Sequence, residues 1–255
     1  VGVAEQNMVG LAAGLASEGL KPYTYSIGIF PTFRCAEQLR NDVDYHQLSV
    51  CSCMVGSGVA YGALGYTHHA IQDLALMRSL PSTVIATPSD PYEVRAVLNW
   101  QLDASVPMYL RLHKRGEPIL HTSIPTLIPC QPVQIHTNVG AQFCVVVVGF
   151  LATEVLRLVN ACKVPVDVYT MPIWGMQDRT RAFDTLRHYK TIISVEDHML
   201  DGGFGSWLLE TLASQGVSKT LIPIAIPSHA VGKVASERTL LAPLISSLEA
   251  TLSTL

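Results

Sequence analysis

Apolar and polar positions in this chain follow two alternating patterns, one typical of buried strands and one of amphipathic helices. Short apolar runs predict strands at residues 21–27, 48–55, 83–87, 108–112, 143–148, 166–170, 191–195 and 219–226. Apolar residues that recur every three or four positions predict helices at residues 1–17, 70–80, 91–103, 153–162, 179–188, 203–214 and 240–252, and one more that opens at Pro31. Because strands alternate with helices, the pattern predicts an α/β fold with mostly parallel sheets wrapped by helices.

The alternation stops between residues 113 and 140, where prolines at 118, 125, 129 and 132 interrupt it. Such a stretch is typical of a linker that crosses a domain surface. We therefore predict an N-terminal domain at residues 1–120, a linker at 121–140 and a C-terminal domain at 141–255. The chain opens at Val1, without a methionine and directly on a helical motif, so we expect that an upstream part is missing or was removed.

Composition excludes several classes of protein. Of the 255 residues, 49% are hydrophobic and 15% are charged, and the formal net charge is −3. There is no basic footprint for nucleic acid or an anionic membrane, and the longest apolar run, 143–152, is too short to span a bilayer. The six cysteines form no zinc pattern and no signal peptide is visible, which favours buried thiols in the reducing cytoplasm.

A single carboxylate, Glu5, lies among apolar and small residues in the opening stretch VGVAEQNMVGLAAGL. On a helix it shares a face with Met8, Ala12 and Leu15, so we expect Glu5 to point inward near the helix N-terminus. A carboxylate at such a position is either stabilised by the helix dipole or held in a cleft for proton chemistry.

Two histidines, His68 and His69, lie where a glycine-rich loop at residues 56–66 enters a helix. His69 and Asp73 have the i, i+4 spacing of a metal-binding pair, but adjacent histidines diverge on a helix and no third ligand is near. We therefore predict no metal site. Capping and packing of the helix start is the other use of these side chains.

Aromatic and basic side chains supply the remaining candidates. Phe30 and Phe33 lie at the start of the second predicted helix, with Arg34 on its polar side. Aromatic residues there either fill the core or stack on a ligand. Lys114 and Arg115 follow a predicted strand, and ligands collect beyond the carboxyl ends of parallel strands, although a solvated basic turn is equally consistent.

Residues 191–212, TIISVEDHMLDGGFGSWLLETL, combine a buried strand, an acidic pair and a glycine turn that opens a helix. Gly203 and Gly205 suggest a dinucleotide-binding loop, but Leu208 stands where a third glycine is needed. We therefore reject a dinucleotide site in this stretch.

Four stretches resemble the transketolase family: GVAEQNMVGLAAGLA, PTFRCAEQLR, GALGYTHH and residues 191–212. The resemblance covers nearly the whole chain. It implies a pyrimidine-binding domain followed by a C-terminal domain, each with three αβα layers, and it assigns residues 191–212 to a scaffold at the subunit interface.

The resemblance also implies a partner. Members of the family hold the diphosphate of thiamine diphosphate through Mg²⁺ on a Gly-Asp-Gly motif in a separate domain, and this sequence contains no such motif. The chain therefore resembles the C-terminal subunit of a split transketolase. It would act with an N-terminal diphosphate-binding subunit that holds the Mg²⁺, in an α₂β₂ or dimeric assembly.

By the same resemblance, Glu5 would exchange a proton with the pyrimidine ring of thiamine diphosphate, and Phe30 or Phe33, of which we choose Phe30, would stack against that ring. The implied reaction is the transfer of a two-carbon ketol unit between sugar or sugar phosphate substrates. A deoxyxylulose-phosphate-type synthase and a 2-oxo acid dehydrogenase E1 β subunit share the fold and the glutamate, so both stay open. A non-catalytic interaction subunit is a further alternative.

On the substrate side, the resemblance implies that His68 contacts the substrate or relays a proton, and that Lys114 or Arg115 binds a substrate phosphate. Two positions depart from the family pattern. Leu64 stands where the family has an Asp that binds a sugar hydroxyl, and Gly56 stands where it has a His. A hydroxyl that loses its polar partner is rejected, so the preference for ordinary ketose phosphates is in doubt.

Overall fold

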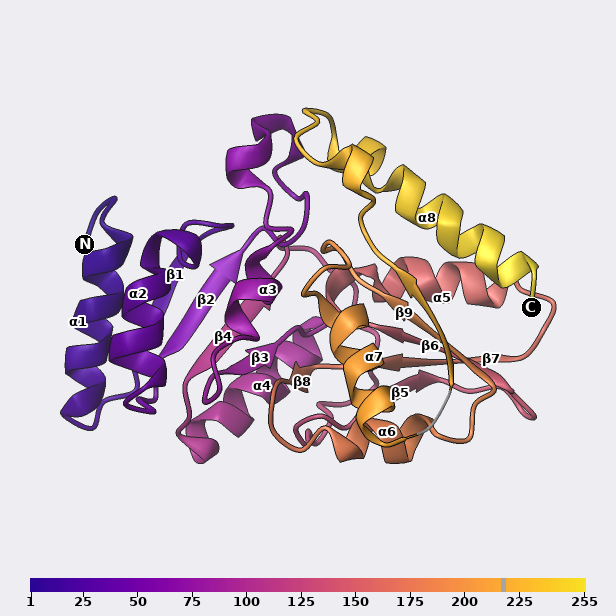
Figure 1. Cartoon of the computed structure of the whole chain (residues 1–255), viewed down its shortest axis with the longest axis horizontal. Helices are drawn as coiled ribbons and strands as arrows, with labels where there is room; N and C mark the ends of the chain where they lie inside the picture. Colours follow the sequence, from indigo (N-terminus) through magenta and orange to yellow (C-terminus); the bar gives the residue numbers. More distant parts are fainter. Residues whose placement is uncertain (217–218) are drawn as a thin grey trace.

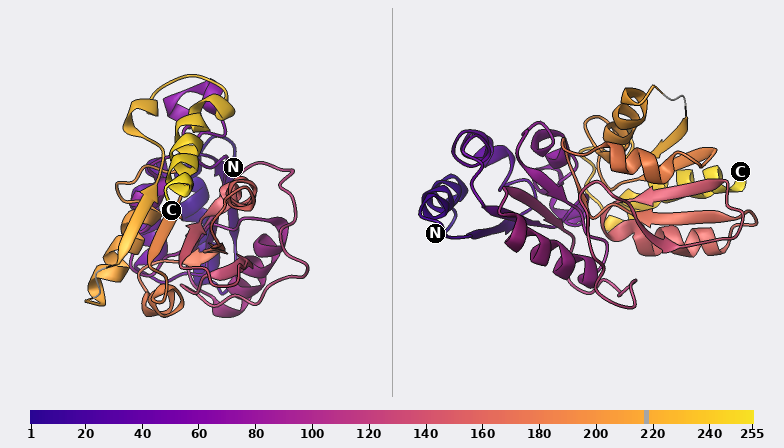
Figure 2. Two further views of the ribbon diagram at one scale, coloured as in Figure 1. Left: turned by 90° about the vertical axis from the view of Figure 1, so that its right-hand side faces the viewer. Right: turned by 90° about the horizontal axis from the view of Figure 1, so that it is seen from below.

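The computed structural model describes residues 1–216 and 219–255, which form two five-stranded sheets with helices on both faces (Figures 1 and 2). The first sheet has the strand order β1-β2-β4-β3-β8 and the second the order β10-β9-β6-β7-β5. Most neighbours are parallel, and β8 and β5 join their sheets antiparallel. The strands are β1 (Tyr23–Ile27), β2 (Cys51–Val55), β3 (Val84–Ala86), β4 (Met108–Leu112), β5 (Val133–His136), β6 (Phe143–Val147), β7 (Val166–Thr170), β8 (Ile173–Trp174), β9 (Thr191–Val195) and β10 (Thr220–Ile224).

The helices follow the strands as the periodicity predicts. Around the first sheet lie α1 (Glu5–Ser17), α2 (Ala36–Gln38) with its continuation η2 (Leu39–Asp44), α3 (Asp73–Met77) and α4 (Pro91–Ala104). Around the second lie α5 (Ala152–Asn160), α6 (Thr180–Leu186), α7 (Phe204–Ser214) and α8 (Glu237–Ser253). The predicted α/β fold with two αβα layer systems is thereby confirmed. None of the helices in the described residues is both long and apolar enough to cross a membrane.

Two short strands, β5 and β8, were not predicted from the sequence. β5 lies inside the proline-rich stretch where the alternation stops, and it pairs with β7 through a bulged register. β8 has only two residues, Ile173 and Trp174, and it pairs with β3 of the first sheet although its neighbours in sequence belong to the second. Both are short edge strands stabilised by long-range contacts, which leave no local periodicity.

The first helix differs from its prediction in start and in buried face. It begins at Glu5 rather than Val1, and its inward side is Glu5, Val9, Ala12 and Ala13. Leu15, predicted to pack inward, is 39% exposed. The prediction that Glu5 shares a face with Leu15 is therefore wrong, because the buried stripe runs through positions i+4, i+7 and i+8, and position i+10 lies on the other side of Glu5. The predicted inward orientation of Glu5 is confirmed, since the residue is 8% exposed.

Two further helix boundaries differ from prediction. Pro31 lies in a turn before the short helix η1 (Phe33–Cys35), not in the first turn of the second helix. The third helix covers only Asp73–Met77 of the predicted residues 70–80. Before it, Tyr66–His68 form a 3-10 helix and Ala70 forms an isolated bridge with Gly58, so the helix begins later than predicted.

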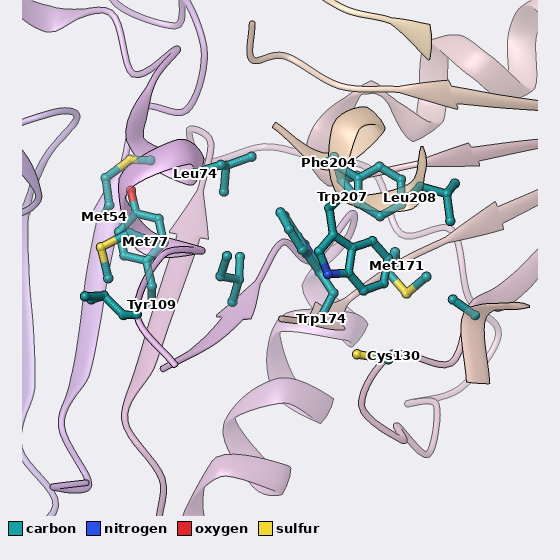
Figure 3. Packing of buried hydrophobic residues seen from close by; sticks show 14 of the residues in the cluster. Met54, Leu74, Met77, Tyr109, Cys130, Met171, Trp174, Phe204, Trp207 and Leu208 are labelled. Atoms are coloured by element: carbon teal, nitrogen blue, oxygen red, sulfur yellow. The ribbon is translucent and has the colours of Figure 1, made fainter. Parts of the chain in front are cut away.

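A single hydrophobic cluster continues from one sheet to the other (Figure 3). Trp174 of β8 lies 5.4 Å, centroid to centroid, from both Phe204 and Trp207 of α7. The indole N–H of Trp207 donates a 2.7 Å hydrogen bond to the carbonyl of Gly175. Since polar atoms of buried aromatics need such partners, these contacts hold β8, the edge strand of the first sheet, against α7.

A buried ion network also joins the two halves. Arg111 of β4 is 2% exposed, and its Nε donates a 2.7 Å hydrogen bond to Asp73 at the start of α3. Its Nη1 pairs with Asp197, which lies two residues beyond β9 and is fully buried. The hydroxyl of Tyr109 donates a 2.7 Å hydrogen bond to Asp73. Burial opposes the charge on Arg111, but the two carboxylates outweigh it and raise the pKa of the guanidinium.

Candidate functional site

Phe30 and His68 are in contact beyond the carboxyl end of β1, and Arg34 links Glu5 to Phe30. Glu5 is the first residue of α1, Phe30 lies in the turn after β1, and His68 ends the short helix η4 (Tyr66–His68). The rings of Phe30 and His68 lie 5.3 Å apart, edge to face. Gly28, with φ of +52°, permits this approach, because a Cβ there would lie 3.2 Å from the carbonyl oxygen of His68.

Arg34 completes the group and was not identified from the sequence. Its Nη1 donates a 2.8 Å hydrogen bond to Glu5 Oε2, and its Cζ lies 4.9 Å from the centroid of the Phe30 ring. We expected Arg34 to face water, and its side chain is 45% exposed, yet its guanidinium points to the carboxylate. The only sequence signal is a basic residue one turn beyond the aromatic, which is too common to single out.

The carboxylate of Glu5 is held in its charged form. The backbone N–H of Glu5 itself and the Arg34 guanidinium lower the pKa of the carboxyl, and the Ser26 hydroxyl adds to this, while burial works in the opposite direction. A carboxylate beside an aromatic ring can accept a hydrogen bond from a flat heterocycle that stacks on that ring. The arrangement therefore suits a ring with a basic or donating nitrogen.

His68 is half-buried, and its second contact is local. Thr67 Oγ1 lies 3.0 Å from His68 Nδ1. Either atom can donate, according to the tautomer of the imidazole. Nδ1 of His68 is therefore paired with Thr67, and the imidazole and Phe30 rings meet edge to face.

Phe33, the alternative aromatic, lies apart from this group. Its side chain is 52% exposed, whereas Phe30 contacts both His68 and Arg34. Of the two aromatics, the geometry therefore favours Phe30 as the residue on which a ring could stack.

Lys114 and Arg115 lie elsewhere, at a cavity of about 390 Å³ between the end of β4 and the start of α5. Lys114 Nζ donates to the carbonyl of Ala60 and lies 3.5 Å from Glu237 Oε2 at the start of α8. Among the described residues, no hydrogen bond or ion pair joins either side chain to Glu5, Phe30 or His68. The predicted site residues thus form two groups.

His113 was not singled out from the sequence, although it lines the same cavity. Its Nε2 lies 3.1 Å from Glu237 Oε1, and its Nδ1 lies 3.4 Å from Ser57 Oγ. Its ring stacks on Phe150 at 3.7 Å. The imidazole and Lys114 together lower the pKa of the Glu237 carboxyl against the opposing effect of burial. These contacts hold the loop after β4 on the second half of the chain.

Within residues 1–216 and 219–255, no three His, Cys, Asp or Glu side chains are arranged to hold a metal ion. His69 is 1% exposed and its Nε2 faces the carbonyl of Gly62 at 3.4 Å. Asp73, the other member of the suspected pair, accepts hydrogen bonds from Arg111 and Tyr109. The i, i+4 spacing therefore reflects packing of the helix start.

Comparison with known proteins decides the family. Residues 1–117 match the family described as the transketolase pyrimidine-binding domain. An apulose-4-phosphate transketolase subunit from Actinobacillus succinogenes is 33% identical over 224 residues, which cover 87% of this chain and 71% of that protein. This chain belongs to the transketolase family.

Other members of the transketolase family are similar over most of this chain. The 1-deoxy-D-xylulose-5-phosphate synthase 2 of Geobacter sulfurreducens is 33% identical over 227 residues, which cover 85% of this chain and 35% of that protein. A solved structure described as a split gene transketolase, inactive beta4 tetramer, superposes with a TM-score of 0.83 at 25% identity and covers 99% of this chain and 81% of its own. The fold is thus that of transketolases.

In this transketolase-family chain, the glycine turn of residues 191–212 serves packing. Glu196 accepts hydrogen bonds from the backbone N–H groups of Phe204, at 2.6 Å, and Gly205, at 2.8 Å, and so caps α7. A Cβ at Gly203 would lie 2.2 Å from Glu196 Oε2. Burial raises the pKa of Glu196 to about 8 although these N–H groups oppose the shift. The glycines are explained by this contact without a nucleotide.

Proposed function

We propose that this chain is the C-terminal subunit of a split transketolase-like enzyme that uses thiamine diphosphate to transfer a two-carbon ketol unit between sugar or sugar phosphate substrates. One observation carries the proposal. On a transketolase fold, the buried Glu5 carboxylate lies at a helix start and is linked through Arg34 to the ring of Phe30. Within this proposal, residues 1–120 form the pyrimidine-binding domain and residues 141–255 the C-terminal domain.

The residues present fit the aminopyrimidine half of the cofactor. Glu5 would hold the ring nitrogen N1′ by sharing a proton with it, and Phe30 would support the ring face. When bound, the cofactor supplies an electron sink for breaking a carbon–carbon bond next to a ketose carbonyl. His68 would hold or move a proton on the substrate, and Lys114 or Arg115 would bind a phosphate at the cavity beyond β4.

Leu64 adds a restriction on the substrate. It is 57% exposed on the loop before His68, where the family pattern has an acidic residue. An apolar side chain cannot replace the lost hydrogen bond, so a sugar that needs a hydroxyl partner at this point would bind poorly. Ordinary ketose phosphates that depend on this hydroxyl contact are therefore expected to be poor substrates.

A second polypeptide is part of the proposal. The sequence contains no Gly-Asp-Gly motif, and the described residues offer no metal-binding group. The diphosphate and Mg²⁺ would then be held by an N-terminal subunit, in an α₂β₂ or dimeric assembly. Two similar proteins support this division, because the one from Actinobacillus succinogenes is a subunit of its transketolase and the solved structure comes from a split gene.

The isolated chain is expected to bind thiamine diphosphate weakly, because it would contact only the pyrimidine half of the cofactor. Calorimetric titration with Mg²⁺ and cofactor, with and without the diphosphate-binding subunit, checks this. Tight stoichiometric binding by the chain alone would contradict the division between two subunits.

Substitution of His68 by Ala in the complete assembly should lower turnover more than cofactor affinity, because His68 is assigned to the substrate. His46→Ala is the matched control, since His46 is exposed and its ring contacts only Tyr45 among the aromatic pairs of the described residues. Steady-state kinetics at saturating cofactor and a cofactor titration separate the two effects. Intact turnover with weakened cofactor binding would show that the assignment of His68 is wrong.

A deoxyxylulose-phosphate-type synthase is the second candidate, supported by the similarity to the Geobacter sulfurreducens protein. Assays with pyruvate against ketose donors distinguish the two reactions. A non-catalytic interaction subunit would turn over neither donor when combined with the diphosphate-binding subunit.

A further inference from the structure

Both groups proposed to hold the pyrimidine ring already have a partner in this chain. Arg34 donates to the Glu5 carboxylate at 2.8 Å, and the same guanidinium lies 4.9 Å from the centre of the Phe30 ring. The planar guanidinium of Arg34 therefore binds the Glu5 carboxylate and covers a face of the Phe30 ring at the same time.

An aminopyrimidine needs the same two features. A guanidinium is planar, donates hydrogen bonds in its plane and stacks on aromatic rings. An aminopyrimidine ring is also planar, shares a proton or donates hydrogen bonds in its plane, and stacks in the same way. The carboxylate oxygen bound by Arg34 and the ring face that it covers cannot serve both groups at once.

We propose that Arg34 occupies the place of the cofactor's aminopyrimidine ring in the free subunit and has to leave before the ring binds. The inference rests on the proposed function. It makes Arg34 an internal competitor that sets cofactor affinity, rather than a residue that holds Glu5 in position for the cofactor.

The local structure permits this movement. Arg34 lies on the short helix η1, its side chain is 45% exposed, and Glu5 is its hydrogen-bond and ion-pair partner. Only the Arg34 side of the pair is exposed, so the guanidinium can turn into solvent, while the buried Glu5 carboxylate then needs a replacement partner. The aminopyrimidine ring would then replace Arg34 as the planar partner of the Glu5 carboxylate.

The test uses a probe that needs no second subunit: 4-amino-5-hydroxymethyl-2-methylpyrimidine, which carries the aminopyrimidine half of the cofactor without diphosphate. Its dissociation constant is measured by NMR titration of the full chain and of the Arg34→Ala variant. If Arg34 occupies the site nine-tenths of the time, the variant should bind the probe about 10-fold more tightly. In the wild type, the ¹⁵N signals of the Arg34 side chain should move toward those of a free guanidinium as the probe is added.

Arg40→Ala is the control, because Arg40 is exposed and its side chain pairs with Asn41. It should leave the dissociation constant of the probe unchanged. Equal or weaker binding by Arg34→Ala would overturn the inference and make Arg34 a positioning residue. If neither chain binds the probe, the inference fails, whereas the proposed function is judged separately by turnover of the complete assembly.

Discussion

Replacement of Arg111 by Met is expected to lower the free energy of unfolding by about 3–5 kcal/mol, because it leaves two buried carboxylates without their common partner. Arg111 is 2% exposed, and Asp73 and Asp197 are both fully buried. Their pairing with Arg111 joins the strand end of the first sheet to that of the second. Urea unfolding, followed by the fluorescence of the buried tryptophans, measures the change.

Two variants make this result specific. Arg157→Met removes an exposed i, i+3 pair with Glu154 and should not change the unfolding midpoint measurably. The triple variant Arg111→Met, Asp73→Asn, Asp197→Asn should recover part of the loss, since it removes the unpaired charges. An Arg111→Met protein as stable as the wild type would mean that the network adds nothing to the association of the two halves.

Glu5→Gln in the complete assembly should reduce turnover by roughly 100-fold or more, the scale of losing a positioned acid–base group. The amide has nearly the same shape and can still accept from Arg34, so packing against Val9 and assembly with the partner should survive. Exchange of the cofactor C2 proton, followed by NMR, measures the step that depends on the proton at N1′. Thermal unfolding of the same variant reports its stability.

A purely structural Glu5 predicts a different outcome. A helix-terminal carboxylate made neutral loses only ~0.3–1 kcal/mol of dipole stabilisation and leaves turnover intact. Glu37→Gln, at an exposed position of α2, gives the baseline for such a loss of charge. Normal C2 exchange in Glu5→Gln would remove the main support for catalysis on this chain.

Periodicity predicted most of the fold because buried parallel strands are continuous apolar runs. β9, for example, is buried along all five residues and reads TIISV. β8 could not be found in this way, since two residues carry no period and their pairing with β3 depends on contacts with α7. β5 was hidden by prolines, which edge strands tolerate and central strands do not.

The candidate site shows the same limit. The sequence predicted that Glu5 points inward, but not its contact with Arg34, which crosses 29 positions. The two carboxylates that pair with Arg111 are 38 and 86 positions away in the sequence. The sequence alone therefore could not show whether Arg111 belongs to a buried ion network or to a solvated basic strand end. Phe30 and Phe33 were equivalent by residue type, and their exposure separates them only in the folded chain.

The placement of β8 in the first sheet limits which segments can be exchanged between related proteins. Residues 1–117 match a recognised domain, yet the fifth strand of their sheet comes from Ile173 and Trp174. A gene segment that ends at residue 117 therefore encodes a sheet with β3 left as an open edge, and open edges invite pairing with other chains. A chimera that exchanges this segment between relatives has to keep the donor's β3 compatible with the recipient's β8. Ile173 and Trp174 lie in the second half of the sequence but in the first sheet, so the two halves of the gene have to change together.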